Sequence, residues 1–283
     1  MTAVALERVS RDFAGPDGSP YRALEDVSLD IAAGAFVAIV GPSGCGKSTL
    51  LNIAAGLVTP TAGLVRVDGE ALAGLNRQAV YMFQHDALLP WKTVRDNVAL
   101  GLTLAGLSRP VAHARADEWL RRVGLAAFAS HYPSQLSGGM RKRVTMAQNW
   151  IIDRPIVLMD EPFSALDVHT RQRMETELLA LWDEGPVLTP GAPAPGRPGS
   201  PLRRTVLFVT HDLEEAIALA DDVVVLSAGP ASRIVARYRV ELGRPRELMD
   251  LRTSPAFIDL YKTMWSVLRE EVMKSQRAGA VHG

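Results

Sequence analysis

The amino-acid sequence predicts an α/β fold in which helices cover a largely parallel sheet. Four short runs are apolar at every position, a pattern typical of parallel strands that are buried on both faces. Stretches of helical character lie between these runs, and such alternation indicates a layered α/β domain. The apolar runs are Phe36 to Val40, Ile156 to Met159, Val206 to Val209 and Val223 to Leu226, and the helical stretches are Ser48 to Gly56, Ala112 to Val123, Gly138 to Ile152, Thr170 to Asp183 and Leu213 to Ala220.

Two segments near the N-terminus predict antiparallel strands. Val4 to Val9 and Arg22 to Ile31 alternate apolar and polar residues, as strands with one buried face do. We expect them to pair near an edge of the sheet and to form an antiparallel β subdomain.

Three further segments depart from the α/β alternation. Residues 85–136 contain helical patterns but no buried apolar run, which predicts a helical subdomain inserted into a main domain that spans residues 1–230. Residues 185–201 hold six prolines and four glycines, which predicts a flexible surface loop. A short turn should be able to replace this loop, and a folded lid is the alternative. Residues 231–283 carry ten Lys or Arg against six Asp or Glu and one helical stretch, which predicts a basic helical tail.

The composition excludes several classes of protein. A content of 47% hydrophobic and 22% charged residues is typical of globular proteins and excludes global disorder. The 31 basic and 31 acidic residues cancel, so no overall attraction to nucleic acid is expected. The longest apolar run, Ile31 to Gly41, has 11 residues, whereas a membrane helix needs about 20. With charges at the N-terminus and one cysteine, the chain is expected neither to span a membrane nor to be secreted.

A glycine-rich motif lies between the apolar run Phe36 to Val40 and a helical stretch. It matches the phosphate-binding pattern G-x-x-x-x-G-K-[ST] in the strand-loop-helix context that the pattern requires. Backbone N–H groups and the helix N-terminus would hold phosphates, while Lys47 would contact the terminal phosphates and Ser48 would bind Mg²⁺. A glycine turn with an incidental lysine is the alternative. The predicted nucleotide-binding residues are Gly41, Pro42, Ser43, Gly44, Cys45, Gly46, Lys47, Ser48 and Thr49.

Two acids, Asp160 and Glu161, follow the apolar run that begins at Ile156. Neighbouring side chains of a strand point to opposite faces, so both acids can serve one site only if the chain turns there, and Pro162 provides the break. Asp160 is suited to bind Mg²⁺ through water, and Glu161 is suited to be the base that polarises the attacking water. Two solvated acids at the start of a loop are the alternative, and the phosphate motif favours the site.

The segment Leu136 to Met140 places Gly138 and Gly139 at the start of a helix, with Ser137 as its N-cap. Two glycines disfavour a first turn unless a ligand must approach the backbone closely. Together with the phosphate motif and the acid pair, this segment resembles the signature of ATP-binding cassette (ABC) ATPases. The resemblance covers Val4 to Gly229.

Other motifs of that family occur in the expected order. Gln84 resembles the glutamine of the Q-loop, Ser164 to Asp167 resembles the D-loop, and His211 resembles the switch histidine. Phe13 falls where the family has its adenine-stacking aromatic, with Tyr21 as the alternative.

The resemblance implies a P-loop NTPase core of ABC type that uses ATP and Mg²⁺. Two chains would form a homodimer in which each ATP lies between the phosphate motif of one chain and the signature of the other. The residues implied are Glu161, His211 and Gln84 for catalysis, Ser48, Gln84 and Asp160 for the metal, and Phe13, Ser137, Gly138, Gly139 and Asp167 for ATP in addition to the phosphate motif.

The segment Phe83 to Val94 is similar to the importer branch for nitrate, sulfonate and taurine, in which LLPW is typical. This likeness implies an ATPase subunit at the cytoplasmic face of the inner membrane that energises uptake of a small anionic solute. Its partners would be transmembrane permease subunits and, indirectly, an extracytoplasmic solute-binding protein. Lys142 stands where the family usually has glutamine. The alternative is a soluble or non-importer ABC ATPase of the lipoprotein-release or cluster-assembly type.

Two residues carry additional hypotheses. Trp91 ends the apolar cluster Leu88 to Trp91, and by resemblance it would anchor a coupling helix of the permease; packing in the subdomain's own core is the alternative. Cys45 lies near a helix N-terminus and Lys47, which predicts a reactive thiolate that MgATP would protect from maleimide. An inert loop residue is the alternative.

Overall fold

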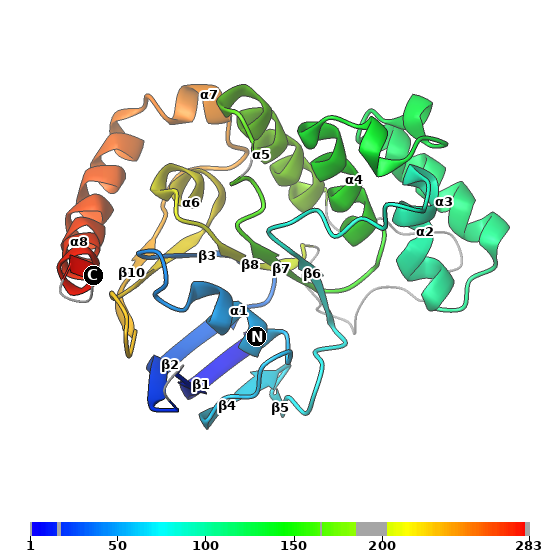
Figure 1. Cartoon of the computed structure of the whole chain (residues 1–283). Coiled ribbons are helices and arrows are strands. Elements are labelled where there is room, and N and C mark those ends of the chain that lie inside the picture. The colour runs from blue at the N-terminus through cyan, green and yellow to red at the C-terminus, as the bar shows by residue number, and fades with distance from the viewer. Residues whose placement is uncertain (1, 16–17, 165, 185–202, 281–283) are drawn as a thin grey trace.

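The computed structural model describes residues 2–15, 18–164, 166–184 and 203–280. Two β-sheets lie on either side of helix α1 (Lys47–Ala54), and other helices cover the outer face of the larger sheet (Figure 1).

The larger sheet has the four apolar runs at its centre. Its strand order is β10-β9-β3-β8-β7-β6, in which β10 is antiparallel to β9 and all other neighbours are parallel. Because the carboxyl ends of parallel strands meet at one edge, the loops that follow β3, β6, β7 and β8 gather there. The strands are β3 (Phe36–Val40), β6 (Ala79–Met82), β7 (Ile156–Asp160), β8 (Thr205–Val209), β9 (Asp222–Leu226) and β10 (Ile234–Arg239).

The smaller sheet is antiparallel, with the order β2-β1-β4-β5. The predicted pairing of the two N-terminal segments is confirmed, with Leu6 opposite Leu29. These strands form a sheet of their own instead of an edge of the larger one, because their apolar faces pack on α1. The strands are β1 (Thr2–Ala14), β2 (Pro20–Ala32), β4 (Ala62–Val67) and β5 (Glu70–Ala71).

Each face of the larger sheet packs into a separate core. Val37 and Ile39 of β3 lie in the core shared with α1 and the smaller sheet. Phe36 lies in the opposite core, together with residues of α5 (Val168–Asp183) and α6 (Leu213–Leu219). Both faces of β3 are therefore dry, which explains its continuous apolar run.

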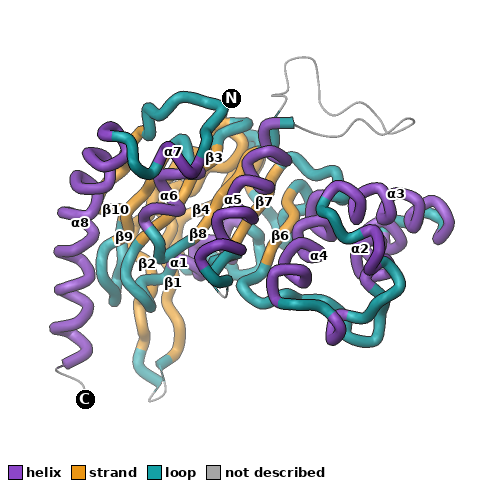
Figure 2. Tube along the Cα trace, turned by 90° about the horizontal axis from the view of Figure 1, so that it is seen from above, coloured by secondary structure: helices purple, strands orange, loops and turns teal. Residues whose placement is uncertain are grey.

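A group of helices lies at the end of the molecule next to β6 (Figure 2). It consists of α2 (Val94–Leu104), α3 (Arg109–Arg122) and α4 (Gly138–Trp150), with short 3-10 turns at Ala126–Phe128 and Pro133–Gln135. Helix α2 packs against both α3 and α4.

The C-terminal region contains the predicted helical stretch, but it also contains a strand that the sequence analysis did not predict. Ile234–Arg239 forms strand β10, whose residues alternate between partly buried and exposed positions. Arg237 and Arg239 form ion pairs with Asp222 at the start of β9, so the strand completes the larger sheet. Helices α7 (Leu248–Leu251) and α8 (Pro255–Ala280) follow, and α8 lies at the opposite end of the molecule from α3 (Figures 1 and 2).

The predicted Pro/Gly loop at 185–201 lies outside the described residues. Within the described ranges, no helix combines the length and the apolar character that crossing a membrane requires.

Candidate active site

The phosphate motif forms a tight loop between β3 and α1. Gly46 is the N-cap of α1 with a φ of 89°, a left-handed conformation that glycine adopts without strain. A Cβ at this position would also lie 2.9 Å from Cδ2 of Leu24. The ammonium of Lys47 donates to the carbonyls of Gly41 and Pro42, each at 2.9 Å. The lysine is therefore held over the loop where a phosphate would lie.

Ser48 and Asp160 meet beside this loop. The Ser48 hydroxyl donates to Oδ1 of Asp160 at 2.9 Å, and the Tyr81 hydroxyl donates to Oδ2 at 3.3 Å. Burial raises the pKa of Asp160, because a low-dielectric environment disfavours the carboxylate. Mg²⁺ prefers oxygen ligands and is often held by one carboxylate together with substrate phosphates. The hydroxyl and carboxylate next to a phosphate loop fit this donor set.

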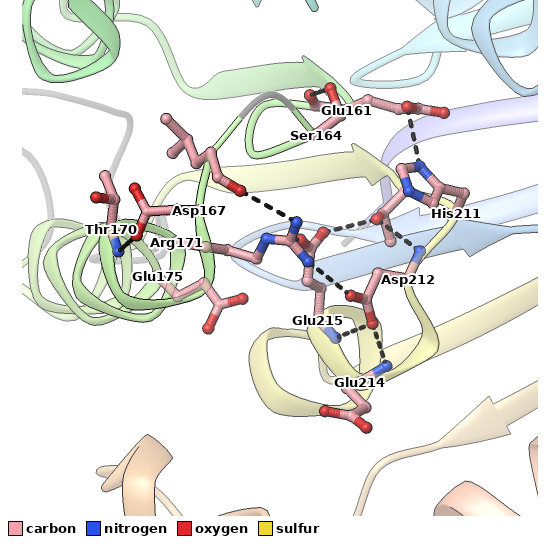
Figure 3. Close-up of polar contacts among 12 residues, drawn as sticks. Glu161, Ser164, Asp167, Thr170, Arg171, Glu175, His211, Asp212, Glu214 and Glu215 are labelled. Carbon is pink, nitrogen blue, oxygen red and sulfur yellow. Dashed lines mark hydrogen bonds and ion pairs between the residues drawn. The ribbon is translucent and has the colours of Figure 1, made fainter. Parts of the chain in front are cut away.

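Glu161 follows Asp160 at the turn that the sequence requires. Its φ of 42° takes the chain out of the strand direction, so that both acids can serve one site. Nδ1 of His211 lies 3.0 Å from Oε2 of Glu161 (Figure 3), and Nε2 of Gln84 donates to the same oxygen at 3.3 Å. Two of the residues predicted to be catalytic, His211 and Gln84, therefore converge on one carboxylate oxygen of the third, Glu161. Gln84, which was also predicted to bind the metal, points its amide at Glu161.

The Gln84 loop is fixed to the helix that follows the signature. Nζ of Lys142 donates to the Gln84 carbonyl at 3.0 Å and lies 3.5 Å from Asp86. Arg141 pairs with the same aspartate at 3.1 Å, and the Thr145 hydroxyl donates to its carbonyl at 3.0 Å. Burial lowers the pKa of Lys142. The residue that departs from the family pattern thus links α4 to the Q-loop.

The signature residues lie at the start of α4. Ser137 is the N-cap, and its hydroxyl accepts from the Met140 N–H at 3.3 Å. Ser137 and Gly138 are exposed, whereas a Cβ on Gly139 would lie 2.6 Å from Cγ2 of Thr170. The contact with Thr170 of the same chain therefore leaves no room for a side chain at Gly139. Nucleotide contact by Ser137, Gly138 and Gly139 stays a prediction.

Asp167 is the N-cap residue of helix α5. Its carboxylate accepts from the Thr170 N–H at 3.0 Å and caps α5, and the Thr170 hydrogen bonds lower its pKa. Contact between Asp167 and ATP stays a prediction.

The two candidates for stacking on adenine lie side by side. Phe13 of β1 is paired with Tyr21 of β2, and the Arg11 guanidinium lies 4.6 Å from the centre of the Phe13 ring. The stacking role stays a prediction for either ring.

The prediction of a reactive thiolate at Cys45 is wrong. The residue is fully buried, and burial raises the pKa of its thiol despite the nearby Lys47 charge. A Cβ on Gly41 would lie 2.8 Å from the sulfur, which shows how closely the loop encloses it. Cys45 is a packing residue of the phosphate loop.

Trp91 lies on the surface instead of in the core of the helical subdomain. It is 71% exposed and borders a groove of about 530 Å³ that is also lined by Asp96, Arg109, His113 and Tyr132. Leu88, in contrast, packs against the main core.

The segment on both sides of Trp91 is held by a residue that the sequence analysis missed. Asn97 is fully buried and makes four hydrogen bonds to this segment, to the N–H and carbonyl of Leu89 and to the carbonyls of Lys92 and Thr93. Its isolated amide on the apolar face of α2 was the available signal.

A polar cluster behind His211 was also missed. Arg171, Asp212 and Glu215 are joined there by ion pairs and hydrogen bonds (Figure 3). Burial raises the pKa of Glu215 to about 7. Charges at the starts of two predicted helices were the only signal.

Comparison with known proteins agrees with this site. Residues 24–164 match the ABC transporter family. An ABC transporter ATP-binding protein of Methanocaldococcus jannaschii is 40% identical over 259 residues, which are 92% of this chain and 89% of that protein. The chain belongs to the ATP-binding proteins of ABC transporters. The family and the ATPase activity predicted from the sequence are thereby confirmed, and ATP is the nucleotide of an ABC cassette.

Two further relatives of this ABC protein carry names of import systems. The taurine import ATP-binding protein TauB of Yersinia pestis is 43% identical, over 83% of this chain and 85% of that one. The nitrate import ATP-binding protein NrtC of Synechococcus elongatus is 37% identical, over 95% of this chain and 38% of that one.

The fold class of the ABC protein is confirmed by solved structures. The ATP-binding cassette MJ0796, in a dimeric post-hydrolysis state with ADP and Pi, has a TM-score of 0.68 and 31% identity. The match covers 85% of this chain and all of that one.

Proposed function

We propose that this chain is the ATP-hydrolysing subunit of an ABC importer for a small anionic solute of the taurine or nitrate kind. The convergence of Gln84 and His211 on the Glu161 carboxylate, beside the phosphate loop, carries the proposal. The importer assignment is supported by relatives named for taurine and nitrate import that match over more than four fifths of the chain. The soluble and non-importer alternatives are not favoured, because the segment LLPW and these relatives agree.

The residues of the site divide the chemistry between binding and proton transfer. Lys47 and the N–H groups of the phosphate loop bind and orient the phosphates of ATP. Glu161 accepts a proton from the attacking water, and His211 and Gln84 keep its carboxylate oriented. Ser48 and Asp160 would hold Mg²⁺, which neutralises charge on the phosphates when it is bound.

The proposed assembly has two copies of the chain and a permease. The exposed Ser137 and Gly138 are available to a second copy, and the dimer of the cassette MJ0796 supports such an arrangement. The groove beside Trp91 would receive a coupling helix of the permease. The complex would sit at the cytoplasmic face of the inner membrane, with an extracytoplasmic solute-binding protein acting through the permease.

The test of the hydrolytic site uses Glu161→Gln and Lys47→Ala. Glu161→Gln should keep ATP affinity and lose most turnover, because an amide holds the water but cannot accept its proton. Lys47→Ala should lose affinity. Nucleotide binding and steady-state hydrolysis are measured on the same preparations, with the exposed Glu70→Gln as control. Wild-type turnover in Glu161→Gln would refute the role of Glu161.

The permease site is tested with Trp91→Ala and Leu89→Ala. Leu104→Ala is the matched control, because Leu104 is 80% exposed on the same helical subdomain. Copurification of the permease should weaken in the Trp91 variant while ATP binding and folding are retained. Normal assembly and transport in that variant would contradict the assignment.

A further inference from the structure

Arg171 connects two loops that carry catalytic residues. It lies on α5, and its guanidinium donates to Oδ2 of Asp212 at 3.0 Å and to the Leu166 carbonyl at 3.3 Å (Figure 3). Its Nε also lies 3.5 Å from Oε1 of Glu215 on α6. Asp212 belongs to the loop of His211, whereas Leu166 belongs to the loop that begins at Glu161. One side chain therefore spans both segments.

Both neighbours of His211 are held in place. The Thr210 hydroxyl donates to Oε2 of Glu215 at 2.7 Å and accepts from the Asp212 N–H at 3.0 Å. Oδ1 of Asp212 accepts from the N–H groups at the start of α6, and its Oδ2 pairs with Arg171. The His211 backbone is thus fixed on each side, although its own side chain is 54% exposed.

Hydrogen bonds among the described residues connect Glu161 to the neighbourhood of the carbonyl that Arg171 binds. The Ser164 hydroxyl donates to the Glu161 carbonyl at 3.0 Å, and the Leu166 N–H donates to the Phe163 carbonyl at 3.1 Å. These hydrogen bonds couple the position of Leu166 to that of Glu161.

We propose that Arg171 is a positioning residue that sets the contact between Glu161 and His211. By holding the Leu166 carbonyl and the Asp212 carboxylate together, it keeps the two loops in register, so that Nδ1 of His211 remains within hydrogen-bond distance of the Glu161 carboxylate. The inference rests on the proposed hydrolytic function and assigns a role to a residue that does not contact the reacting atoms. A displacement of about 1 Å at such a contact can lower a rate by roughly a hundredfold.

A second ion pair prevents a neighbouring acid from competing for the Arg171 guanidinium. Glu175 lies one turn further along α5, is fully buried, and would compete for the Arg171 guanidinium. Arg252 of the C-terminal segment pairs with Glu175 at 2.6 Å instead. The residues after β10 therefore contribute a countercharge that frees Arg171 for Asp212 and Leu166.

A purely structural ion pair is the competing explanation, and the choice of variants separates the two. Arg171→Lys keeps the charge but cannot reach several acceptors at once, because an ammonium is a compact point charge. Asp212→Asn keeps the helix cap, since asparagine is a good N-cap, but removes the charge that Arg171 binds. Arg173→Lys is the control, because Arg173 lies on the same helix, is 68% exposed, and pairs with Glu177.

The full-length chain is assayed for ATP turnover, ATP affinity, melting temperature and hydrogen exchange of peptides covering 161–167 and 205–212. Arg171→Lys should lower kcat about tenfold with KM changed less than twofold, and exchange in both peptides should rise. The Asp212→Asn and Arg171→Lys effects on kcat should not add in the double variant, because they remove one interaction.

Wild-type kcat in Arg171→Lys, or a kcat loss without faster exchange in both peptides, would overturn the inference. Equal effects from Arg173→Lys would overturn it as well. If the wild-type chain itself hydrolyses no ATP, the proposed function fails, and the exchange data still test whether Arg171 holds the two loops.

Discussion

Replacing Gly139 by alanine tests whether this glycine serves packing, nucleotide binding or both. A Cβ at Gly139 would lie 2.6 Å from Cγ2 of Thr170, whereas a Cβ at Gly138 would meet nothing closer than 3.8 Å. Both glycines lie in the first turn of α4, so Gly138→Ala is a matched control for the change in helix propensity.

The expected free energies follow from these contacts. Alanine in place of glycine stabilises a helix by up to about 1 kcal/mol, and Gly138→Ala should show a gain of that order or less. Overpacking costs about 1–3 kcal/mol, so Gly139→Ala should be less stable than Gly138→Ala by roughly this amount. Thr170→Ser removes the clashing methyl group and should restore the stability of Gly139→Ala.

The assay combines urea unfolding with ATP turnover of the four variants, the fourth being Gly139→Ala with Thr170→Ser. If Gly139 also binds nucleotide, as the proposed signature role implies, this double variant should recover stability but keep turnover at least about tenfold below wild type. Full recovery of turnover would show that Gly139 is only a packing residue. Equal stabilities of Gly138→Ala and Gly139→Ala would refute the packing argument itself.

Three other residues give predictions that need only the purified chain. Asn97→Ala should lower the free energy of unfolding by about 2–4 kcal/mol, because four hydrogen bonds of roughly 1 kcal/mol each are lost. The control Asn149→Ala loses one hydrogen bond and should lower it by about 1 kcal/mol. Equal losses of stability for the two variants in urea unfolding would contradict the role of Asn97. Burial raises the pKa of Glu215 from 4.5 to about 7, so the folded chain binds the extra proton. The stabilising contribution of this protonation is complete below pH 4.5 and is lost as the pH rises to 7. Glu215→Gln should therefore have a free energy of unfolding about 3 kcal/mol above that of wild type at higher pH, and no such advantage below pH 4.5. A pH-independent difference would refute the assignment. Cys45 should react with maleimide slowly with or without MgATP, because it is buried; fast labelling of the folded chain would contradict this.

The residues of the site that could be predicted from the sequence are those that follow buried strands. Lys47, Asp160 and His211 each come a few residues after a continuous apolar run, and parallel strands bring such positions to one edge. The strand order was not needed for this prediction, because the loops that follow parallel strands all lie at the carboxyl edge of the sheet.

The residues that could not be predicted depend on contacts between helices. Arg171 and Glu215 each look like one charge among several at a helix start, and their partnership arises only when α5 and α6 pack side by side. Cys45 shows the same limit, because its position in the motif suggested a thiolate while burial by the folded loop raises its pKa.

Strand β10 was missed although its signal was present. IVARYR alternates apolar and polar residues, but the surrounding basic residues suggested a solvated tail. Edge strands with one exposed face carry this mixed composition.

Strand β10 determines where this protein can be shortened safely. A chain that stopped at Pro230 would leave β9, with its sequence DVVVL, as the open edge of a parallel sheet. Such an apolar edge offers unpaired N–H and C=O groups to other chains and promotes aggregation. In the intact chain, β10 is the edge strand, and its Arg237 and Arg239 discourage other chains from adding a further strand. A truncated form for expression should therefore retain strand β10, and it should also keep the helices beyond it, because Phe257 and Met264 lie in the main core and Arg252 pairs with the buried Glu175.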